Sequence, residues 1–228
     1  MPSTKDTFER VYRTHRWGAD GGGSGPGSTF EQSMGASRVL FHVILSLNVN
    51  SVVDAACGAM TWQSKLLPQL LSLKPSLRYM GLDAAQQVVD QNNLLFRHYY
   101  PNVRFQYTEL ESVVIPPTDL IFSRETLQHN TLTGVAQILH RFAQSNASHI
   151  LTTSYPNGSH YCRGPINRPI ATGDFFCIDL ARKPFQLHPV AKFEEIAFDK
   201  KWLYLYDRAS LARQLYKSHA WLRSTKNV

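Results

Sequence analysis

Cysteine is scarce in this sequence, and its three cysteines form no recognisable pattern. Cys57, Cys162 and Cys177 are odd in number and include no CxxC pair. This argues against a disulfide framework and against a zinc centre built from thiolates. HExxH and HxxxH spacings are absent as well, so we predict no metal site. Such a sequence is typical of a reducing compartment, and we expect a cytoplasmic location.

Long apolar runs are also missing. The most apolar stretch near the N-terminus, residues 39–47, contains His42 and Ser46 and is too short to span a bilayer. Residues 1–10 are polar and charged and lack the apolar centre of a signal peptide. We therefore predict a soluble chain without membrane insertion.

Acidic residues are outnumbered by basic ones. Lys and Arg total 24 against 17 Asp and Glu, which gives a net charge of +7. Such a surface tolerates anionic partners, but no known RNA-binding module is recognisable, so we do not expect a nucleic-acid partner. The residues after Asp207 are basic without an acid, as in a solvated helix face or an anion-binding arm. Nothing in the sequence indicates an oligomeric state.

What the sequence does contain is apolar material for a core and a regular alternation of elements. Hydrophobic residues make up 43% of the 228 residues, which suits one domain over residues 1–228. From residue 51 on, apolar runs that predict strands alternate with helical patterns. Five strands are expected at 51–55, 79–83, 103–107, 120–123 and 149–153.

The alternation predicts an α/β fold with a Rossmann-like, doubly wound and mostly parallel sheet. Two further alternating runs, 193–198 and 202–206, predict an antiparallel terminal hairpin around Asp199-Lys200 and bring the sheet to seven strands. We expect Pro68 to break or kink the helix after the first strand. Residues 155–190 lose all periodicity but are rich in aromatics, which is typical of a functional loop.

A glycine-rich segment, residues 21–28, leaves two interpretations open. Its composition is that of a flexible linker. However, Ser28-Thr29-Phe30-Glu31 has the form of a capping box at the start of a helix, so the segment opens onto a helix N-terminus that can receive an anion.

Acidic residues stand at the ends of successive predicted strands. Asp54 ends the first strand, Asp83 ends the second, Glu109 follows the third, and Asp119–Glu125 spans the fourth. In doubly wound sheets ligands bind at these carboxyl ends, and an acid after the second strand is placed to bind ribose hydroxyls. The GxGxxG fingerprint is absent, which argues against NAD and FAD.

The order of these acids, with Gly58 in the first turn, resembles the class I S-adenosylmethionine (SAM)-dependent methyltransferases over roughly residues 50–155. Ala56 and Ala59 stand where that family often has glycine. The resemblance implies SAM as cofactor and S-adenosylhomocysteine (SAH) as product. It implies that Asp54, Ala55 and Gly58 lie along the methionine, that Asp83 binds the ribose, and that Glu109 contacts the adenine amine. The other expected cofactor-binding residues are Trp17, Ser24, Gly25, Ser28, Trp62, Ala84, Leu110 and Arg124.

A narrower resemblance covers more of the chain. Tyr12…Trp17-Gly18, Ser24–Ser28, Arg124–His129 and Asn167-Arg168…Thr172–Phe175 are similar to small methyltransferases of bacteria, algal viruses and some animals, several of them linked to O-methylation of glycans. The resemblance implies a glycan or other sugar-bearing acceptor. It also makes Ser24–Ser28 a lid over the methionine carboxylate. The chain is then divided into N-terminal helices and lid (1–50), cofactor-binding core (51–154), substrate loop (155–190), and hairpin with basic tail (191–228).

A sugar hydroxyl is a poor nucleophile at neutral pH, so a general base is expected. Our two candidates are His129 and Asp174, although His129 could simply pack and Asp174 could be a turn residue. The expected substrate-binding residues are Glu125, Tyr155, His160, Tyr161, Arg163, Asn167 and Phe175. Arg124 and Glu125 could instead form a surface ion pair.

Other functions remain open at this point. The acceptor could be a small metabolite, a protein or RNA. Because Ala56 and Ala59 weaken the cofactor motif, the chain could also be a non-catalytic binding protein.

Overall fold

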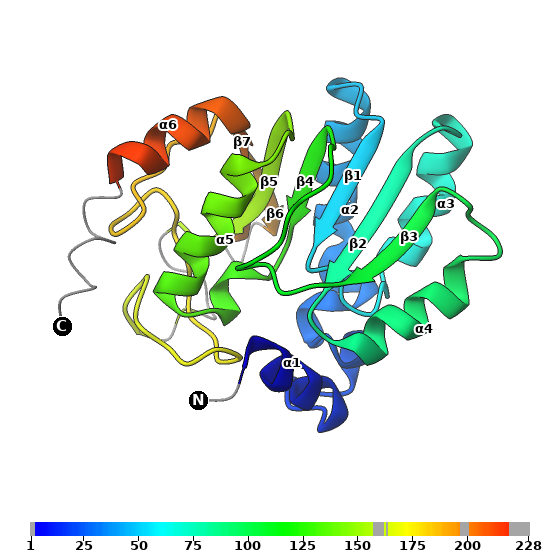
Figure 1. Ribbon diagram of the computed structural model, residues 1–228, viewed down its shortest axis with the longest axis horizontal. Coiled ribbons are helices and arrows are strands. Elements are labelled where there is room, and N and C mark those ends of the chain that lie inside the picture. The colour runs from blue at the N-terminus through cyan, green and yellow to red at the C-terminus, as the bar shows by residue number, and fades with distance from the viewer. Residues whose placement is uncertain (1–2, 157–161, 163, 197–200, 219–228) are drawn as a thin grey trace.

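The computed structural model describes residues 3–156, 162, 164–196 and 201–218 (Figure 1). Four predicted positions or segments lie outside the described residues: His160 and Tyr161, Arg163, Asp199-Lys200, and residues 219–228 of the basic tail. Within the described part of the chain, no helix combines the length and the apolar composition needed to cross a membrane.

A sheet of seven strands forms the centre of the described residues, in the order β3-β2-β1-β4-β5-β7-β6. The first five strands pair in parallel, while β7 runs antiparallel to both β5 and β6. This confirms the predicted fold class. The bounds are β1 Ser51–Ala55, β2 Arg78–Asp83, β3 Val103–Tyr107, β4 Leu120–Ser123, β5 His149–Ser154, β6 Ala191–Ile196 and β7 Lys201–Asp207.

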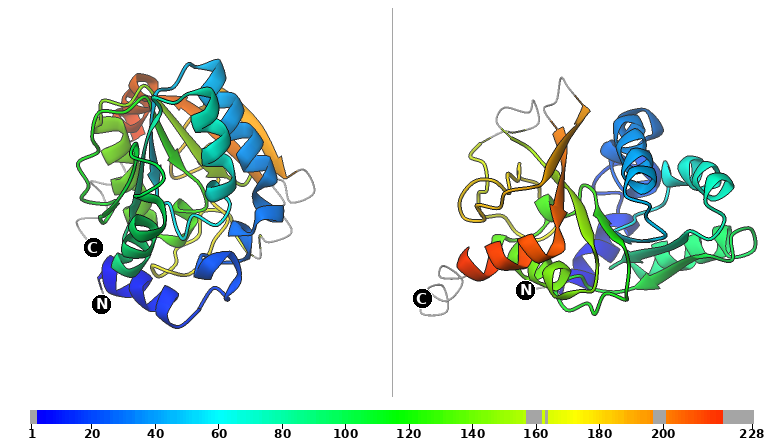
Figure 2. Two further views of the ribbon diagram at one scale, coloured as in Figure 1. Left: turned by 90° about the vertical axis from the view of Figure 1, so that its right-hand side faces the viewer. Right: turned by 90° about the horizontal axis from the view of Figure 1, so that it is seen from above.

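Helices cover both faces of the sheet (Figures 1 and 2). They are α1 Thr4–Arg13, α2 Phe30–Ser46, α3 Gln63–Leu73, α4 Gln86–Phe96, α5 Leu132–Gln144 and α6 Arg208–Ser218, with 3-10 turns η1 Asp20–Gly23, η2 Pro26–Ser28 and η3 Leu127–His129. Pro68 does not break the helix, and α3 continues through it to Leu73.

Alternate side chains of the central strands build two separate halves of the core. Val53 of β1 packs with α5 and α6 on one face, while its neighbour Val52 packs with α2 and α3 on the other. The same alternation holds for Ile150 and Leu151 of β5. Strands that are buried on both faces read as unbroken apolar runs, which is why the sequence predicts them well.

The helix α2 begins one residue later than the predicted capping box. Its N-cap is Thr29, whose side-chain oxygen accepts from the backbone N–H of Gln32 at 3.4 Å. Ser28 belongs to the preceding 3-10 turn, and its hydroxyl donates to the carbonyl of Ser24 at 3.3 Å. The predicted pairing of Ser28 with Glu31 is therefore wrong, since the turn before the helix has its own use for that serine.

The glycine-rich segment is folded, so the linker interpretation is wrong. Gly21 and Gly22 have φ of 59° and 66°, which glycine adopts without strain. A Cβ at Gly22 would lie 2.7 Å from the Cβ of Ala59, and one at Gly21 would lie 2.7 Å from the Cβ of Ser28. The glycines are there because the segment packs closely on itself and on the turn after β1.

The described part of the loop 155–190 has no helix or strand, as expected, but it contains a disulfide. Cys162 and Cys177 are bonded, with their Cα atoms 5.4 Å apart, and Cys57 is free and buried. An odd number of cysteines argues against a framework of bridges but leaves room for one. The cysteines therefore do not indicate a reducing compartment, and the cytoplasmic location stays a prediction.

Candidate active site

The site lies at the carboxyl ends of β1, β2 and β4, where the strand order reverses between β1 and β4. In doubly wound sheets this reversal opens a crevice. A cavity here, which we call the inner cavity, is also lined by Thr4, Phe8 and Tyr12 of α1. Figure 1 shows α1 below these strand ends. The cavity contains most of the expected cofactor-binding residues: Trp17, Ser24, Ser28, Asp54, Gly58, Trp62, Asp83, Ala84, Leu110 and Arg124.

Asp54 is buried at the end of β1 and is bonded by neutral donors. The hydroxyl of Tyr79 and the amide of Gln63, the latter at 3.1 Å, both donate to its Oδ2. Burial raises the pKa of Asp54 to about 7, because these hydrogen bonds offset only part of the lost hydration. The carboxyl group therefore keeps its proton to a much higher pH than an exposed aspartate does.

Asp83 joins the ends of β1 and β2. Its two carboxylate oxygens accept from the backbone N–H groups of Gly58 at 3.0 Å and Ala85 at 2.9 Å. Burial raises its pKa to about 6, against the lowering effect of these bonds. The backbone groups of Gly58, Ala84 and Ala85 use at most three of the carboxylate's about four acceptor sites, so it is able to accept from a ligand hydroxyl as well.

The glycine-rich segment reaches the first turn through Ser24. Its hydroxyl accepts from the N–H of Ala59 at 3.0 Å and lies 2.9 Å from the hydroxyl of Tyr12. Gly58 has φ of 61°, and a Cβ there would lie 2.7 Å from the Ser24 oxygen. Glycine is therefore required at this point by both backbone conformation and close approach.

Three expected cofactor-binding residues lie outside the inner cavity: Ala55, Glu109 and Gly25, of which Gly25 lines the second cavity described below. Ala55 is buried in β1, and its carbonyl accepts from the hydroxyl of Thr126 at 3.2 Å. Glu109 accepts from the hydroxyl of Tyr107 at 3.3 Å and does not line the cavity, whereas Glu111 does. The loop after β3 has no periodicity, so the sequence carries no signal for which acid faces inward.

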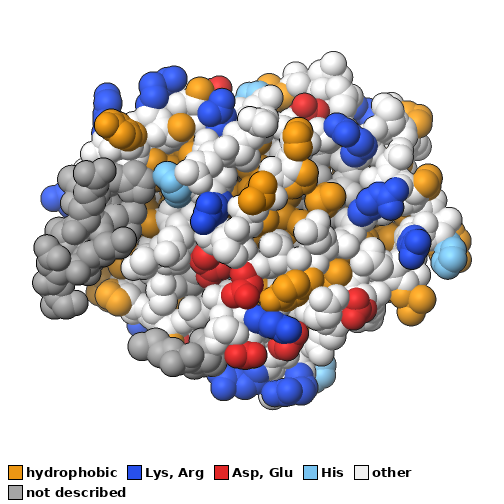
Figure 3. All heavy atoms as spheres, in the orientation of Figure 1, with side chains coloured by type: hydrophobic (Ala, Val, Ile, Leu, Met, Phe, Trp, Pro, Cys, Tyr) orange, Lys and Arg blue, Asp and Glu red, His pale blue; other side chains and the backbone are white. Residues whose placement is uncertain are grey.

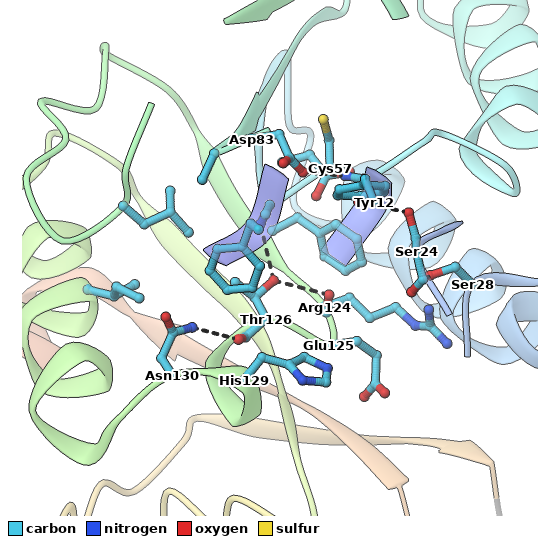
Figure 4. Close-up of a pocket in the computed structure, with 18 of the residues that line it drawn as sticks. Tyr12, Ser24, Ser28, Cys57, Asp83, Arg124, Glu125, Thr126, His129 and Asn130 are labelled. Atoms are coloured by element: carbon cyan, nitrogen blue, oxygen red, sulfur yellow. Dashed lines mark hydrogen bonds between the residues drawn. The ribbon is translucent and has the colours of Figure 1, made fainter. Parts of the chain in front are cut away.

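A second cavity, which we call the outer cavity, adjoins the first. The lining shared by the two is Trp17, Ser24, Ser28, Glu125 and His129; the outer cavity adds Gly25, Pro26, Gly27, Gln32, Tyr155, Phe175 and Lys201. Figure 4 shows Glu125 and His129 on the side opposite Asp83 and Cys57, with Ser24 and Ser28 at the edge. Expected cofactor-binding and substrate-binding residues thus meet along one common wall.

His129 lines both cavities and uses one ring nitrogen in a hydrogen bond. Its Nδ1 lies 2.8 Å from the backbone carbonyl of Asp174. A carbonyl can only accept, so Nδ1 carries the proton and Nε2 has a free lone pair. The ring centre is 4.3 Å from that of Trp17. Burial lowers the pKa of His129 below 6.5, although the Asp174 carbonyl and Glu125 oppose this, so the imidazole is neutral at pH 7.

The side chain of Asp174 is not brought into either cavity. Its carboxylate forms an exposed ion pair with Arg16, and the residue contributes its backbone carbonyl to His129 instead. Of the two candidate bases, only His129 lines the inner or the outer cavity.

Glu125 stands where the two cavities meet. It adopts φ of 56°, and its backbone N–H donates to the hydroxyl of Thr153 at 2.9 Å. The hydroxyl of Tyr155 lies 2.7 and 3.0 Å from the two carboxylate oxygens and donates to them. Burial alone would raise the pKa of Glu125, but the charges of Lys201 and Arg124 and the Tyr155 bond lower it below its ordinary value. The group is therefore an anion at neutral pH.

Arg124 is buried and pairs with the terminal hairpin rather than with Glu125. Its Nη2 and Nε lie 2.6 and 3.0 Å from Oε1 of Glu195. Lys201 of β7 reaches the same oxygen at 3.1 Å. The alternative of a surface ion pair between Arg124 and Glu125 is thus wrong. Sequence reasoning missed Glu195 and Lys201, because only the pairing of distant strands brings them here.

The remaining expected residues divide into three groups. Tyr155 and Phe175 line the outer cavity, with ring centres 6.1 Å apart and nearly perpendicular. Asn167 lines neither cavity, because its side chain bonds the backbone of Asp179 and Lys183. His160, Tyr161 and Arg163 lie outside the described residues. No cluster of three or more His, Cys, Asp or Glu suited to a metal occurs in the described part of the chain.

Comparison with known proteins rests on structure. No family model matches this chain, and neither does any curated protein. Human N-acetylserotonin methyltransferase in complex with SAM is similar with a TM-score of 0.59, at 15% identity over 90% of this chain and 60% of that one. N-methyltransferase NodS from Bradyrhizobium japonicum WM9 with SAH gives 0.58, at 14% identity over 90% and 98%. Magnesium protoporphyrin IX methyltransferase from Synechocystis PCC 6803 with SAM gives 0.56, at 12% identity over 90% and 97%.

These identities are too low to transfer an activity or a substrate, but the likeness extends over most of the described sheet and its helices. Together with the strand order and the antiparallel β7, it establishes the architecture. This chain has the Rossmann-like fold of the SAM-dependent methyltransferases.

Proposed function

We propose that the chain is a SAM-dependent methyltransferase that methylates a hydroxyl of a sugar in a glycan. The observation that carries this proposal is the meeting of two cavities at His129. The inner one is walled by strand-end acids, and the outer one by aromatic side chains.

The inner cavity suits an adenosyl cofactor in its chemistry. Asp83 keeps carboxylate lone pairs beside the Gly58 turn, as binding of ribose hydroxyls requires. Gly58 leaves no room for a Cβ, and Ser24 of the lid lies directly against it. When bound, SAM supplies a methyl group whose bond to sulfur breaks as the acceptor oxygen bonds to it.

The chain's own residues supply positioning and proton removal. Trp17, Tyr155 and Phe175 offer flat apolar faces to an acceptor in the outer cavity. The free Nε2 of His129 takes the proton of the acceptor hydroxyl, while the Asp174 carbonyl holds the ring in the required tautomer. Holding the two reacting centres in line provides much of the rate enhancement.

An acceptor screen tests this proposal. The protein is incubated with methyl-labelled SAM and with glycans, small metabolites or RNA, and products are identified by mass spectrometry. We expect label in a sugar hydroxyl. Label in RNA, with binding that falls steeply as salt rises, would overturn the choice of acceptor. On the face shown in Figure 3, acidic side chains gather in the lower middle and basic ones are scattered, which does not resemble a nucleic-acid track.

A further inference from the structure

The backbone conformation of Glu125 fixes the direction of its carboxylate. The residue follows the end of β4 and adopts the left-handed φ of 56°, which disfavours a side chain other than glycine, asparagine or aspartate. Its N–H is fixed by Thr153 of the neighbouring strand at 2.9 Å. Backbone strain of this kind clusters at functional sites, so its presence where two cavities meet indicates that the direction of the Glu125 side chain is important for ligand binding.

The carboxylate also has unused hydrogen-bonding capacity. Two carboxylate oxygens offer about four acceptor sites. Within the described residues, the Tyr155 hydroxyl is the one hydrogen-bond donor to this group, and it has a single proton to share between both oxygens. Because Glu125 lines both cavities, the remaining lone pairs are available to a ligand there.

Among the described residues, Glu125 is the one carboxylate that lines the outer cavity, and Lys201, which also lines it, is paired with Glu195. Arg124 and Lys201 are both bound directly to Glu195 on one side of the wall. No Lys or Arg among the described residues comes within ion-pair distance of Glu125 itself. A charged acceptor group of the same sign would therefore be repelled, whereas hydroxyl groups would be bound.

Glu125 and His129 are suited to different tasks. The free Nε2 of a neutral imidazole takes a proton, and an ionised carboxylate held by a tyrosine hydroxyl accepts a hydrogen bond without removing the proton. Two such groups side by side can each serve one of two neighbouring hydroxyls. Phe175, whose ring centre is 5.7 Å from that of His129, and Tyr155 offer apolar faces to the ring that carries them.

We propose that Glu125 binds the hydroxyl next to the one that is methylated, and that the acceptor is an uncharged sugar ring with two neighbouring free hydroxyls. This inference rests on the proposed function and narrows its substrate class. Uronic acids and phosphorylated sugars are excluded by the carboxylate.

The test uses a panel of methyl glycosides: mannoside, galactoside, rhamnoside, xyloside and glucuronide. Binding to the SAH-loaded protein is followed by saturation-transfer NMR, and methyl transfer is followed with labelled SAM. The wild-type protein is compared with Glu125→Gln. Glu194→Gln is the matched control, since Glu194 is exposed on β6 beside the buried Glu195.

We expect at least one uncharged glycoside to bind and the glucuronide to bind at least tenfold more weakly. Glu125→Gln should raise the KM for the uncharged acceptor by about 10- to 100-fold, the value of one charge-assisted hydrogen bond. The substitution should also reduce the ratio by which uncharged glycosides bind more tightly than the glucuronide. A merely structural role of Glu125 would leave this ratio unchanged. A deoxy analogue that lacks the neighbouring hydroxyl should have the same KM with the wild-type protein and with Glu125→Gln.

Several results would overturn the inference. One is a Glu125→Gln protein with the wild-type KM and the wild-type preference for uncharged glycosides, and another is a Glu194→Gln protein whose KM rises as much as that of Glu125→Gln. The others are a glucuronide that binds the wild-type protein as tightly as the uncharged glycosides, and the binding of no glycoside at all. Calorimetry with SAH on the same preparations separates this from the proposed function. A protein that methylates a glycan in the acceptor screen but binds no uncharged glycoside of this panel contradicts the inference alone, whereas a protein that binds no SAH contradicts the proposed function itself.

Discussion

Asp54 and Asp83 are kept inside the protein by neutral donors, and this has a cost in stability. Their pKa values are raised from 3.8 to about 7 and about 6, so the folded state holds protons that the unfolded chain has already lost. The free energy of unfolding therefore falls as pH rises from about 4 to about 7. Acids that destabilise a ligand-free fold are typical of a binding site.

The substitution Asp54→Asn tests this cost. The asparagine side chain could still accept from Tyr79 and Gln63 but carries no charge to desolvate. We expect wild-type protein to lose about 2–3 kcal/mol relative to Asp54→Asn between pH 5 and pH 8. Urea unfolding of the ligand-free proteins at both pH values measures the difference. If the free energies of unfolding of the wild-type protein and Asp54→Asn changed equally between the two pH values, the destabilising effect of the buried Asp54 charge would be contradicted.

His129 is expected to control turnover. Its neutral form takes the proton, so activity should rise with pH through a pKa below 6.5 and stay level above neutrality. His129→Gln should lower kcat by about 10²–10⁴-fold while leaving the Kd for SAH nearly unchanged. Asp174→Asn removes the other candidate carboxylate but keeps the carbonyl, and should retain activity. Loss in Asp174→Asn with normal turnover in His129→Gln would reverse these roles.

At the scale of elements, Ser24 links the segment that we propose as a lid to the rest of the site. Ser24 joins the segment 20–28 to both α1 and the turn after β1. We expect Ser24→Ala to speed proteolysis within this segment several-fold, and SAH to protect the wild-type segment. Limited proteolysis followed by mass spectrometry measures both effects. Ser37→Ala on α2 is the control, and equal cleavage rates in all samples would show that the lid does not respond to ligand.

The disulfide makes a separate contribution in the loop after β5. It joins two cysteines with a sequence separation of 15, and closing a loop of that length contributes about 3 kcal/mol through the entropy of the unfolded chain. We expect a reducing agent to lower the free energy of unfolding by up to about this amount. Cys177→Ser should be equally destabilised and insensitive to the reductant, whereas Cys57→Ser should remain sensitive. Insensitivity of the wild-type protein would contradict the bridge.

Elements were predictable where a local pattern determines them. The strands β1 and β4 are apolar on both faces, so their runs stand out, and the acids at their ends follow directly. The segment 21–28 was ambiguous because its glycines serve contacts with Ala59 and Ser28, which composition does not reveal. The Thr29 cap was missed by one residue because Ser28 belongs to the preceding 3-10 turn and its hydroxyl donates to the carbonyl of Ser24.

At the scale of the whole molecule, the site is assembled from distant parts of the chain. The parallel strands bring Asp54 and Asp83 together, and the sequence predicts this from topology alone. The hairpin then returns Glu195 and Lys201 to Arg124, some seventy residues away along the chain. No local pattern carries that pairing, so the place of Lys201 in the outer cavity could not be predicted, whereas Glu125, His129, Tyr155 and Phe175 of the same cavity were expected.

The measurement that bears most directly on the account is calorimetric titration with SAH. We expect the wild-type protein to bind, and Asp83→Asn to bind at least about tenfold more weakly, because charge-assisted bonds to the ribose are lost. Asp90→Asn, a change of the same kind at an exposed position of α4, should bind like wild type. Absence of SAH binding by the wild-type protein, or equal binding by Asp83→Asn, would contradict an adenosyl cofactor at the strand ends.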